Sequence, residues 1–412
     1  MLIEFRVENY RSLRDEQAIT FEASNVGDAN DPRPRKVPGH DTALLPAVVL
    51  YGANASGKSN VLYAMAFMRD TVQASQRFWE PEGGIPRSAF AWGDSAQSPS
   101  MLEATFLVDE TKYVYGFVVD DEVVKEEWLY SWPKNRKQVW LERDGMQFKF
   151  GEHLKGPNGS VKEVTRVNSL YLSAAAQQGH EQLTPIYAWF RGVSPWNVGG
   201  RIPNASRRFE IPRGLNLAVK QSDRSLERIQ ALLSAADFGI VGIRQEKFGL
   251  DTSRHFSRFM LQHRSNNEDA WLPLEDESDG TKTLFNLSPY LFDALDTGSL
   301  LLVDELESSL HPLLALAIVK MFNSPESNPL NAQLLFTTHD TNLLSPVVGE
   351  PPFRRDQIWF TEKDDNGASN LYPLTDFKPR NSENIERGYL QGRYGAIPYL
   401  GDMTWIAEKK NG

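Results

Sequence analysis

The first segment of this chain whose residue types could support chemistry is residues 52–59, which read Gly-Ala-Asn-Ala-Ser-Gly-Lys-Ser. They match the pattern G-x-x-x-x-G-K-[S/T] of a phosphate-binding loop, whose glycines let backbone N–H groups turn toward a phosphate chain. Lys58 is expected to reach the β- and γ-phosphates, and the Ser59 hydroxyl to bind Mg²⁺. The residues predicted to contact the nucleotide are Gly52, Asn54, Ala55, Ser56, Gly57, Lys58, Ser59 and Asn60.

The sequence on both sides of this loop supports the interpretation. Residues 44–51 form an apolar run typical of a buried strand, and residues 60–69 favour a helix. A helix that starts there directs the positive end of its dipole toward the phosphates. We therefore predict a strand, a phosphate-binding loop and a helix in this order.

Two carboxylates follow a second apolar run. Residues 298–305 read Gly-Ser-Leu-Leu-Leu-Val-Asp-Glu, which is typical of a buried strand that delivers acids to its carboxyl end, where ligands of open α/β sheets bind. Asp304 is predicted to hold Mg²⁺, directly or through water, and Glu305 to polarise the attacking water as a general base. Such a strand is weak evidence alone, but beside a phosphate-binding loop it becomes specific.

Two further segments are candidates to complete a nucleotide site. Residues 334–340 read Leu-Leu-Phe-Thr-Thr-His-Asp, so His339 follows a third buried strand and is expected to sense or orient the γ-phosphate. Residues 277–281 read Glu-Ser-Asp-Gly-Thr before a predicted helix, where Ser278 and Gly280 are placed to donate hydrogen bonds to a phosphate. An ordinary helix N-cap explains this short stretch equally well.

Composition places the chain among ordinary globular proteins. The 412 residues are 41% hydrophobic and 24% charged, with a net charge of −10 that argues against a generally cationic DNA coat but not against a local basic patch. There are no cysteines, which excludes disulfides, thiolate metal sites and cysteine nucleophiles. We expect no signal peptide and no membrane span, because no apolar run approaches the roughly 20 residues required. A cytoplasmic location is predicted.

The expected organisation surrounds the nucleotide site with two inserted parts. Short strands across residues 101–150 predict an antiparallel meander, whose aromatic residues are interpreted as a core face in preference to a base-stacking platform. A helix is predicted at 222–238. The basic residues that precede it or lie on it are either a solvated face or a contact with nucleic acid or a partner, and they are Arg207, Arg208, Arg213, Lys220, Arg224 and Arg228. The predicted divisions are an N-terminal part of the core at 1–75, a β-meander lobe at 76–175, a helical insertion with returning strands at 176–270, a C-terminal part of the core at 271–376 and a partner-contact tail at 377–412.

The order of these segments resembles that of ABC-class ATPases. The long separation of Lys58 from Asp304 and the opening Phe-Arg-Val-Glu-Asn-Tyr-Arg-Ser-Leu are similar to the SMC/RecF/OLD branch of that class. The stretch Ser-Ser-Leu-His-Pro at 308–312 fits the same pattern, and residues 384–398 resemble bacterial ATP-binding proteins of the RloA/AbiL abortive-infection type. The resemblance extends over essentially the whole chain.

The resemblance implies an α/β fold, an ABC-type ATPase head with a mixed sheet, an antiparallel β-meander lobe and a helical insertion. It implies ATP and Mg²⁺ as cofactors, with Lys58, Glu305 and His339 as catalytic residues and Ser59 and Asp304 as metal ligands. It also implies a head-to-tail homodimer or larger assembly, in which Ser278 and Gly280 of one protomer face the γ-phosphate held by Lys58 of the other. The expected role is an ATP-gated sensor or scaffold in anti-phage defence with a separate Toprim-type nuclease effector.

Some features depart from the pattern, and alternatives stay open. Glu277, Thr281 and His311 stand where transporter ATPases have other residues, no Q-loop glutamine can be placed, and no Toprim acidic cluster is visible, so nuclease activity is not expected of this chain. One alternative is a DNA-repair ATPase of the SMC/RecF class, which would bind DNA directly and in a salt-sensitive manner. Another is a scaffold with a structural nucleotide. DNA or a phage component is a further candidate partner, and a membrane is not.

Overall fold

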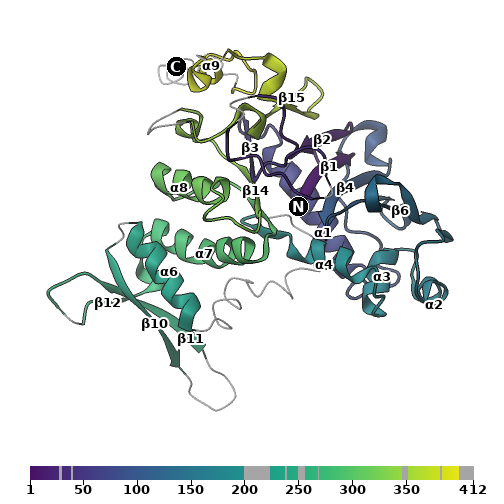
Figure 1. The fold of residues 1–412 in the computed structure, drawn as a ribbon, viewed down its shortest axis with the longest axis horizontal. Coiled ribbons are helices and arrows are strands. Elements are labelled where there is room, and N and C mark those ends of the chain that lie inside the picture. Colours follow the sequence, from purple (N-terminus) through teal and green to yellow (C-terminus); the bar gives the residue numbers. More distant parts are fainter. Residues whose placement is uncertain are drawn as a thin grey trace, which may run out of the picture.

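The fold was analysed in a computed structural model, which combines a mixed sheet, an antiparallel sheet and a small third sheet with helices (Figure 1). This mixed α/β architecture confirms the predicted fold class. The structure describes residues 1–26, 30–38, 40–198, 223–236, 239–248, 256–267, 269–345, 351–380 and 383–398.

The central element is a six-stranded sheet of strand order β16-β15-β3-β14-β13-β9. All neighbouring pairs are parallel except the edge pair β15–β16. Every residue of β3, β13 and β14 is buried, which explains why the sequence shows these strands as apolar runs. Because the strands are parallel, the chain leaves all three at the same edge of the sheet. The strands are β3 (Ala47–Gly52), β9 (Ser194–Trp196), β13 (Leu300–Val303), β14 (Gln333–Thr337), β15 (Ile358–Lys363) and β16 (Ser369–Pro373).

Helices cover both faces of this sheet because its side chains alternate between two cores. Val48 and Leu50 of β3 belong to the same hydrophobic cluster as Leu62 of α1, whereas Val49 belongs with Leu291 of α7 to a second cluster. The long helices are α1 (Lys58–Ala74), α7 (Asp279–Thr297) and α8 (Pro312–Asn323). In Figure 1, α7 and α8 lie on the opposite side of the central strands from α1.

The predicted meander is confirmed and extends to the N-terminus. The seven-stranded antiparallel sheet has the order β2-β1-β4-β5-β6-β7-β8, so the first strand of the chain pairs with the first strand of the meander. The side chain of Gln333 joins the two large sheets, since its Nε2 donates to the carbonyl oxygens of Leu2 (2.9 Å) and Leu45 (3.2 Å). The strands are β1 (Leu2–Glu8), β2 (Gln17–Thr20), β4 (Ser100–Val108), β5 (Thr111–Val119), β6 (Val124–Trp132), β7 (Gln138–Asp144) and β8 (Gln147–Phe150).

The aromatic residues of the meander do not form a single core face. Phe106, Tyr115 and Phe117 are buried, as expected. Trp128 and Tyr130 alternate along β6 with buried residues and are half-exposed on the other face of the sheet, so the prediction is wrong for these two. The buried face packs against α2 (Asn158–Val164), α3 (Tyr171–Gln177) and α4 (Thr184–Gly192).

A smaller three-stranded sheet lies at the opposite end of the molecule from the meander (Figure 1). The predicted helix before it is confirmed as α6 (Asp223–Ala235), which packs on β10 (Ile240–Phe248), followed by β11 (Phe256–His263) and β12 (Trp271–Pro273). The basic residues predicted at 207–220 lie outside the described residues. The short 3₁₀ helices are η1 (Gly93–Ala96), η2 (Pro133–Asn135), η3 (Leu274–Asp276), η4 (Thr341–Leu344), η5 (Arg355–Gln357) and η6 (Leu374–Phe377).

The C-terminal part that was expected to be a partner-contact tail is packed into the core over residues 383–398. It contains α9 (Ile385–Leu390), and Tyr389, Tyr394 and Ala396 are buried in the same cluster as β3. Residues 399–412 lie outside the described part. Within the described residues, no helix is long and apolar enough to cross a membrane.

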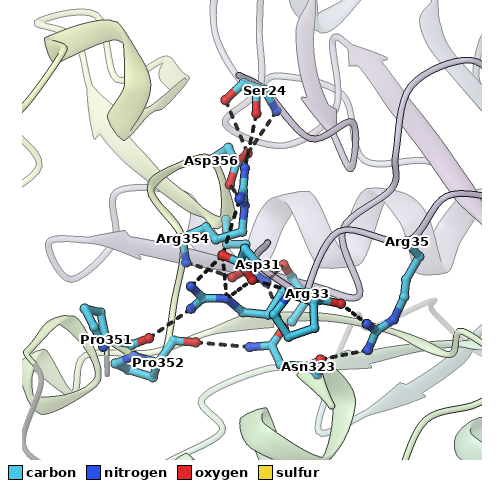
Figure 2. Close-up of polar contacts among 12 residues, drawn as sticks. Ser24, Asp31, Arg33, Arg35, Asn323, Pro351, Pro352, Arg354 and Asp356 are labelled. Carbon is cyan, nitrogen blue, oxygen red and sulfur yellow. Dashed lines mark hydrogen bonds and ion pairs between the residues drawn. The ribbon is translucent and has the colours of Figure 1, made fainter. Parts of the chain in front are cut away.

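A buried ion network fixes the N-terminal loop to the start of β15, at the edge of the mixed sheet where β3 begins (Figure 2). Arg354 bonds Asp31 and Asp356 at 3.3 and 2.8 Å, and Asp356 accepts the backbone N–H of Ser24 at 2.9 Å. Arg33 contacts Asp31 and the carbonyl oxygen of Pro351. A cleft of about 1000 Å³ adjoins this network, but these two guanidinium groups are engaged by protein oxygens. We therefore assign the network a structural role.

Candidate functional site

The predicted phosphate-binding loop connects β3 to α1 as expected. Ala55 and Gly57 have φ angles of 62° and 110°, in the left-handed region. A Cβ atom at Gly57 would lie 2.1 Å from the Ser369 Oγ atom, so this position requires glycine for space as well as for conformation. Asn54 and Ala55 are exposed at the tip of the loop, while Ser56 and Gly57 are buried.

A set of hydroxyl groups from distant segments holds the loop. The Ser56 Oγ atom lies 2.6 Å from the Thr361 Oγ1 atom of β15. The Ser369 hydroxyl of β16 donates to the Ser56 carbonyl oxygen at 2.5 Å, and its oxygen lies 2.7 Å from the Ser12 hydroxyl oxygen, which accepts the Asn60 side-chain amide at 2.6 Å. The N-terminal loop and the edge strand therefore fix the backbone shape of the phosphate-binding loop.

Lys58, the first residue of α1, folds back over the loop. Its ammonium group donates to the carbonyl oxygens of Gly52 (2.8 Å) and Ala53 (3.1 Å), and the residue is only 5% exposed. Burial lowers the pKa of Lys58 from 10.5 to about 8, against the opposing effect of nearby carboxylates, of which Asp304 contributes most. The loop therefore holds a buried cation beside its own carbonyl oxygens.

The Asp304 carboxylate accepts hydrogen bonds from side chains of two other elements. Its Oδ1 atom accepts hydrogen bonds from Ser59 at 2.8 Å and from Thr337 at 2.7 Å, and the Tyr63 hydroxyl lies 3.3 Å from its Oδ2 atom. Asp304 follows β13, Thr337 ends β14, and Ser59 and Tyr63 lie on α1. The parallel sheet thus brings the loop and the carboxylate together across the intervening strand β14.

Glu305 and His339 lie beside this cluster. Glu305 is exposed with a φ of 55°, and its backbone N–H donates to Thr337 Oγ1 at 2.8 Å. The backbone N–H of His339 donates to Glu307 Oε1 at 2.5 Å. The His339 side chain reaches solvent, yet its pKa is lowered, first by desolvation of the ring and then by the positive charge of Lys58. This shift favours the neutral imidazole.

The structure places Ser278 and Gly280 at the start of α7. Ser278 is the N-cap: its Oγ accepts the Thr281 backbone N–H at 3.2 Å and lies 2.8 Å from the Thr281 hydroxyl. The preceding Glu277 is buried and its carboxylate lies 2.6 Å from His263 Nε2 of β11. In the described part of the chain, no hydrogen bond or ion pair links Ser278 or Gly280 to the phosphate-binding loop.

The oxygen atoms of this site suit Mg²⁺. The Ser59 hydroxyl and the Asp304 carboxylate are 2.8 Å apart and are the hard oxygen ligands that this ion takes. Mg²⁺ sites in nucleotide-binding proteins use one or two protein oxygens and complete their shell with phosphates and water. The described residues contain no cluster of three or more His, Asp or Glu side chains suited to a metal ion.

Sequence reasoning missed several residues that shape this site. Thr337 stands in the quoted Thr-Thr-His-Asp stretch and Ser12 in the opening Tyr-Arg-Ser-Leu stretch, so both were within recognised segments. Tyr63, Thr361 and Ser369 carry no local signal, because their contacts depend on which elements become neighbours in the fold.

Comparison with known proteins identifies a family to which the chain belongs. Residues 47–345 match the family model described as "AAA domain, putative AbiEii toxin, Type IV TA system", which covers well over half of the chain. No curated protein sequence matches the chain significantly.

Solved structures of low sequence identity also match. The SMC head domain from Thermotoga maritima matches with 12% identity and a TM-score of 0.39, over 90% of this chain and 98% of that one. An SMC head bound to the C-terminal winged-helix domain of ScpA matches with 14% identity and a TM-score of 0.45, over 94% and 99%. An SMC head with an extended coiled coil, bound to the C-terminal domain of ScpA derived from Pyrococcus furiosus, matches with 11% identity and a TM-score of 0.43, over 95% and 98%.

Proposed function

Since the chain belongs to the AAA-domain family whose description names AbiEii-type toxins of type IV toxin–antitoxin systems, we propose that it is an ATPase that acts as an ATP-gated switch in anti-phage defence. The observation that carries the ATPase proposal is the convergence of Lys58, Ser59 and Asp304 at one edge of a parallel sheet. These three residues come from two distant parts of the sequence, and their side chains are of the types that bind phosphate and Mg²⁺.

Each residue of the cluster has a role that its surroundings support. Lys58 exchanges the loop carbonyl oxygens of Gly52 and Ala53 for phosphate oxygens, which satisfy its buried charge better. Ser59 and Asp304 hold Mg²⁺, which when bound neutralises charge on the β- and γ-phosphates. Thr337 keeps the Asp304 carboxylate oriented toward α1.

Glu305 and His339 are proposed to act on the attacking water and the γ-phosphate. The left-handed backbone of Glu305 is uncommon for a residue with a side chain and turns the chain sharply after β13. The exposed carboxylate is free to take a proton from water as a general base. The N–H of a neutral His339 imidazole donates one hydrogen bond to the γ-phosphate without adding charge.

The proposed active form is a head-to-tail dimer or larger assembly. Ser278 is exposed at the start of a 19-residue helix and has no bond to the loop of its own chain in the described residues, which supports an encounter with a second protomer. Its hydroxyl and the Gly280 backbone N–H would then face the phosphates held by Lys58 of that protomer. A separate effector, proposed as a Toprim-type nuclease, would respond to closure of the assembly.

ATP hydrolysis by purified protein tests the proposal. The wild type should hydrolyse ATP in a Mg²⁺-dependent reaction, Glu305→Gln should bind ATP without turnover, and Asp296→Asn, an exposed change at the end of α7, should behave as the wild type. Cells that carry the wild-type chain with its neighbouring genes should survive phage challenge better than cells that carry Glu305→Gln. Binding without turnover in the wild type would favour the scaffold with a structural nucleotide, and ATP-dependent, salt-sensitive DNA binding would favour the SMC/RecF-like alternative.

A further inference from the structure

The C-terminal segment of residues 383–398, named here the C-terminal brace, is a folded element with its own internal contacts. Glu383 bonds Arg393 and accepts the Tyr394 hydroxyl at 2.8 Å, which closes the segment on itself. A Cβ at Gly388 would lie 2.7 Å from the Tyr394 hydroxyl oxygen, so glycine permits the close approach of that ring. The Asn384 side chain caps α9 by accepting the Arg387 backbone N–H at 2.8 Å. The brace therefore has a defined shape that can position other groups.

Tyr389 is the point at which the brace meets the phosphate-binding loop. Its ring packs edge-on against Tyr51 (5.7 Å between centroids) and stacks on Phe360 of β15 (5.5 Å). Its hydroxyl donates to the carbonyl oxygen of Ala396 at 3.2 Å, which lies within the brace. Tyr51 and Gly52 are the last two residues of β3, immediately before the loop.

The brace also contacts the segment that carries His339. The Thr341 hydroxyl donates to Glu386 of α9 at 3.3 Å, and α9 packs on η4, which begins at Thr341. The Tyr51 hydroxyl donates to the carbonyl oxygen of Asp340 at 3.0 Å. The phosphate-binding loop, the brace and the segment after β14 are thus joined through the Tyr51–Tyr389 pair.

The ring and the hydroxyl of Tyr389 contact different parts of the molecule. The ring packs against Tyr51 at the end of β3, whereas the hydroxyl bonds the Ala396 carbonyl oxygen within the brace. A phenylalanine would keep the ring but lose this bond, so the brace that holds the ring against Tyr51 would be loosened.

We propose that Tyr389 is a positioning residue that sets the phosphate-binding loop through its ring contact with Tyr51, so that the C-terminal brace and ATP binding are energetically coupled. This inference rests on the proposed function, since it concerns the loop that binds ATP. This coupling is reciprocal. A loop that is ordered by ATP stabilises the brace, and loosening the brace lowers the affinity of the loop for ATP.

The test compares Tyr389→Phe with Tyr171→Phe, a matched control. Tyr171 is likewise buried, against two phenylalanine rings, and its hydroxyl bonds Asn158 at 3.2 Å, but it lies in the meander lobe. Both changes remove one buried phenol hydroxyl, so both should lower the melting temperature of the ATP-free protein by a similar amount. Titration calorimetry with ATP–Mg²⁺ should give an affinity about fivefold weaker in Tyr389→Phe and unchanged in Tyr171→Phe.

Hydrogen exchange on the wild type provides a measurement that does not depend on how well Tyr389→Phe folds. ATP should slow the exchange of the amides of α9 severalfold, and Lys58→Ala should abolish this protection. Equal ATP affinity in the wild type and Tyr389→Phe, or α9 amides indifferent to ATP, would overturn the inference alone. A wild type that does not bind ATP would instead contradict the proposed function.

Discussion

The Ser59 hydroxyl lies 2.8 Å from the Asp304 carboxylate, although the two residues are separated by more than half of the chain. The contact exists because β3 and β13 are parallel strands of one sheet with β14 between them, so that the chain leaves both strands at the same edge. Thr337 at the end of β14 bridges the gap by bonding the same carboxylate oxygen at 2.7 Å. The order and direction of the strands in the sheet therefore bring the site residues together. The role of each residue can be tested by its own substitution.

Asp304→Asn should remove the Mg²⁺ dependence of ATP binding. The amide keeps the shape of the carboxylate but loses the negative charge that Mg²⁺ requires, and loss of a direct ligand should cost at least the roughly 10–100-fold in metal affinity caused by changes to groups around a metal site. ATP titrations with and without Mg²⁺ measure the effect. Asp296→Asn serves as the control, and an Asp304→Asn protein with wild-type Mg²⁺ dependence would exclude Asp304 as the ligand.

ATP affinity should fall as the pH rises above about 8. Free Lys58 has a pKa lowered to about 8, and bound phosphates would raise it again, so binding takes up a proton above this pH. The contribution of the charge is complete below pH 8 and is lost at higher pH, by at most about tenfold per pH unit. Calorimetry between pH 7 and 9.5 gives the slope. Lys58→Arg, whose charge does not titrate in this range, should show a flat profile, and a flat wild-type profile would contradict the assignment.

Glu305→Gln should trap the closed assembly. The amide can neither accept the proton of water nor repel the γ-phosphate, so ATP is bound but turned over slowly. Light scattering should show an ATP–Mg²⁺-dependent increase in mass that decays in the wild type and persists in Glu305→Gln. If the mass of both proteins does not change when ATP is added, the assembly is preformed or the nucleotide is structural.

Glu127→Ala should destabilise the meander lobe without touching the nucleotide site. Glu127 and Arg143 are both fully buried as an ion pair at 3.2 Å, and Glu127 also accepts the backbone N–H groups of Tyr171 and Leu172. Removing the carboxylate leaves the guanidinium uncompensated, at a cost of about 3–5 kcal/mol in the free energy of unfolding. Denaturant titration measures the loss. The exposed neighbour variant Glu126→Ala should stay within about 0.5 kcal/mol of the wild type, and similar losses in both would refute the explanation.

The sequence predicted those parts of the fold whose signal is local. The loop at 52–59, the apolar strands before Asp304 and His339, and the short strands of the meander all depend on patterns within a few residues, and each strand is present in the structure. The two sides of a strand were harder to assign. Trp128 and Tyr130 were expected in the core because aromatic residues favour strands, but the alternation along β6 turns them outward while Glu127 points inward.

The remainder depended on contacts between distant segments. Ser12, Ser369 and Thr361 support the loop only because the N-terminal loop and the strands β15 and β16 meet it in space. The C-terminal residues were expected to be a tail because their glycines and arginines interrupt any helical pattern. Gly388 and Gly395 instead allow Tyr389 and Tyr394 to pack against β15, a relationship that appears only when the sheet is formed.

The central claim is that Lys58 and its loop bind ATP, and calorimetric titration of ATP–Mg²⁺ into the wild type and Lys58→Ala tests it most directly. Among the residues that the structure describes, the buried Lys58 ammonium group donates hydrogen bonds only to the loop itself, at Gly52 and Ala53. Lys58→Ala should therefore stay folded, which its melting temperature will show. We predict saturable ATP binding by the wild type and at least a tenfold weaker affinity in the variant, as loss of a charged hydrogen bond to phosphate requires. Equal affinities, or a folded wild type that binds no ATP, would contradict the account.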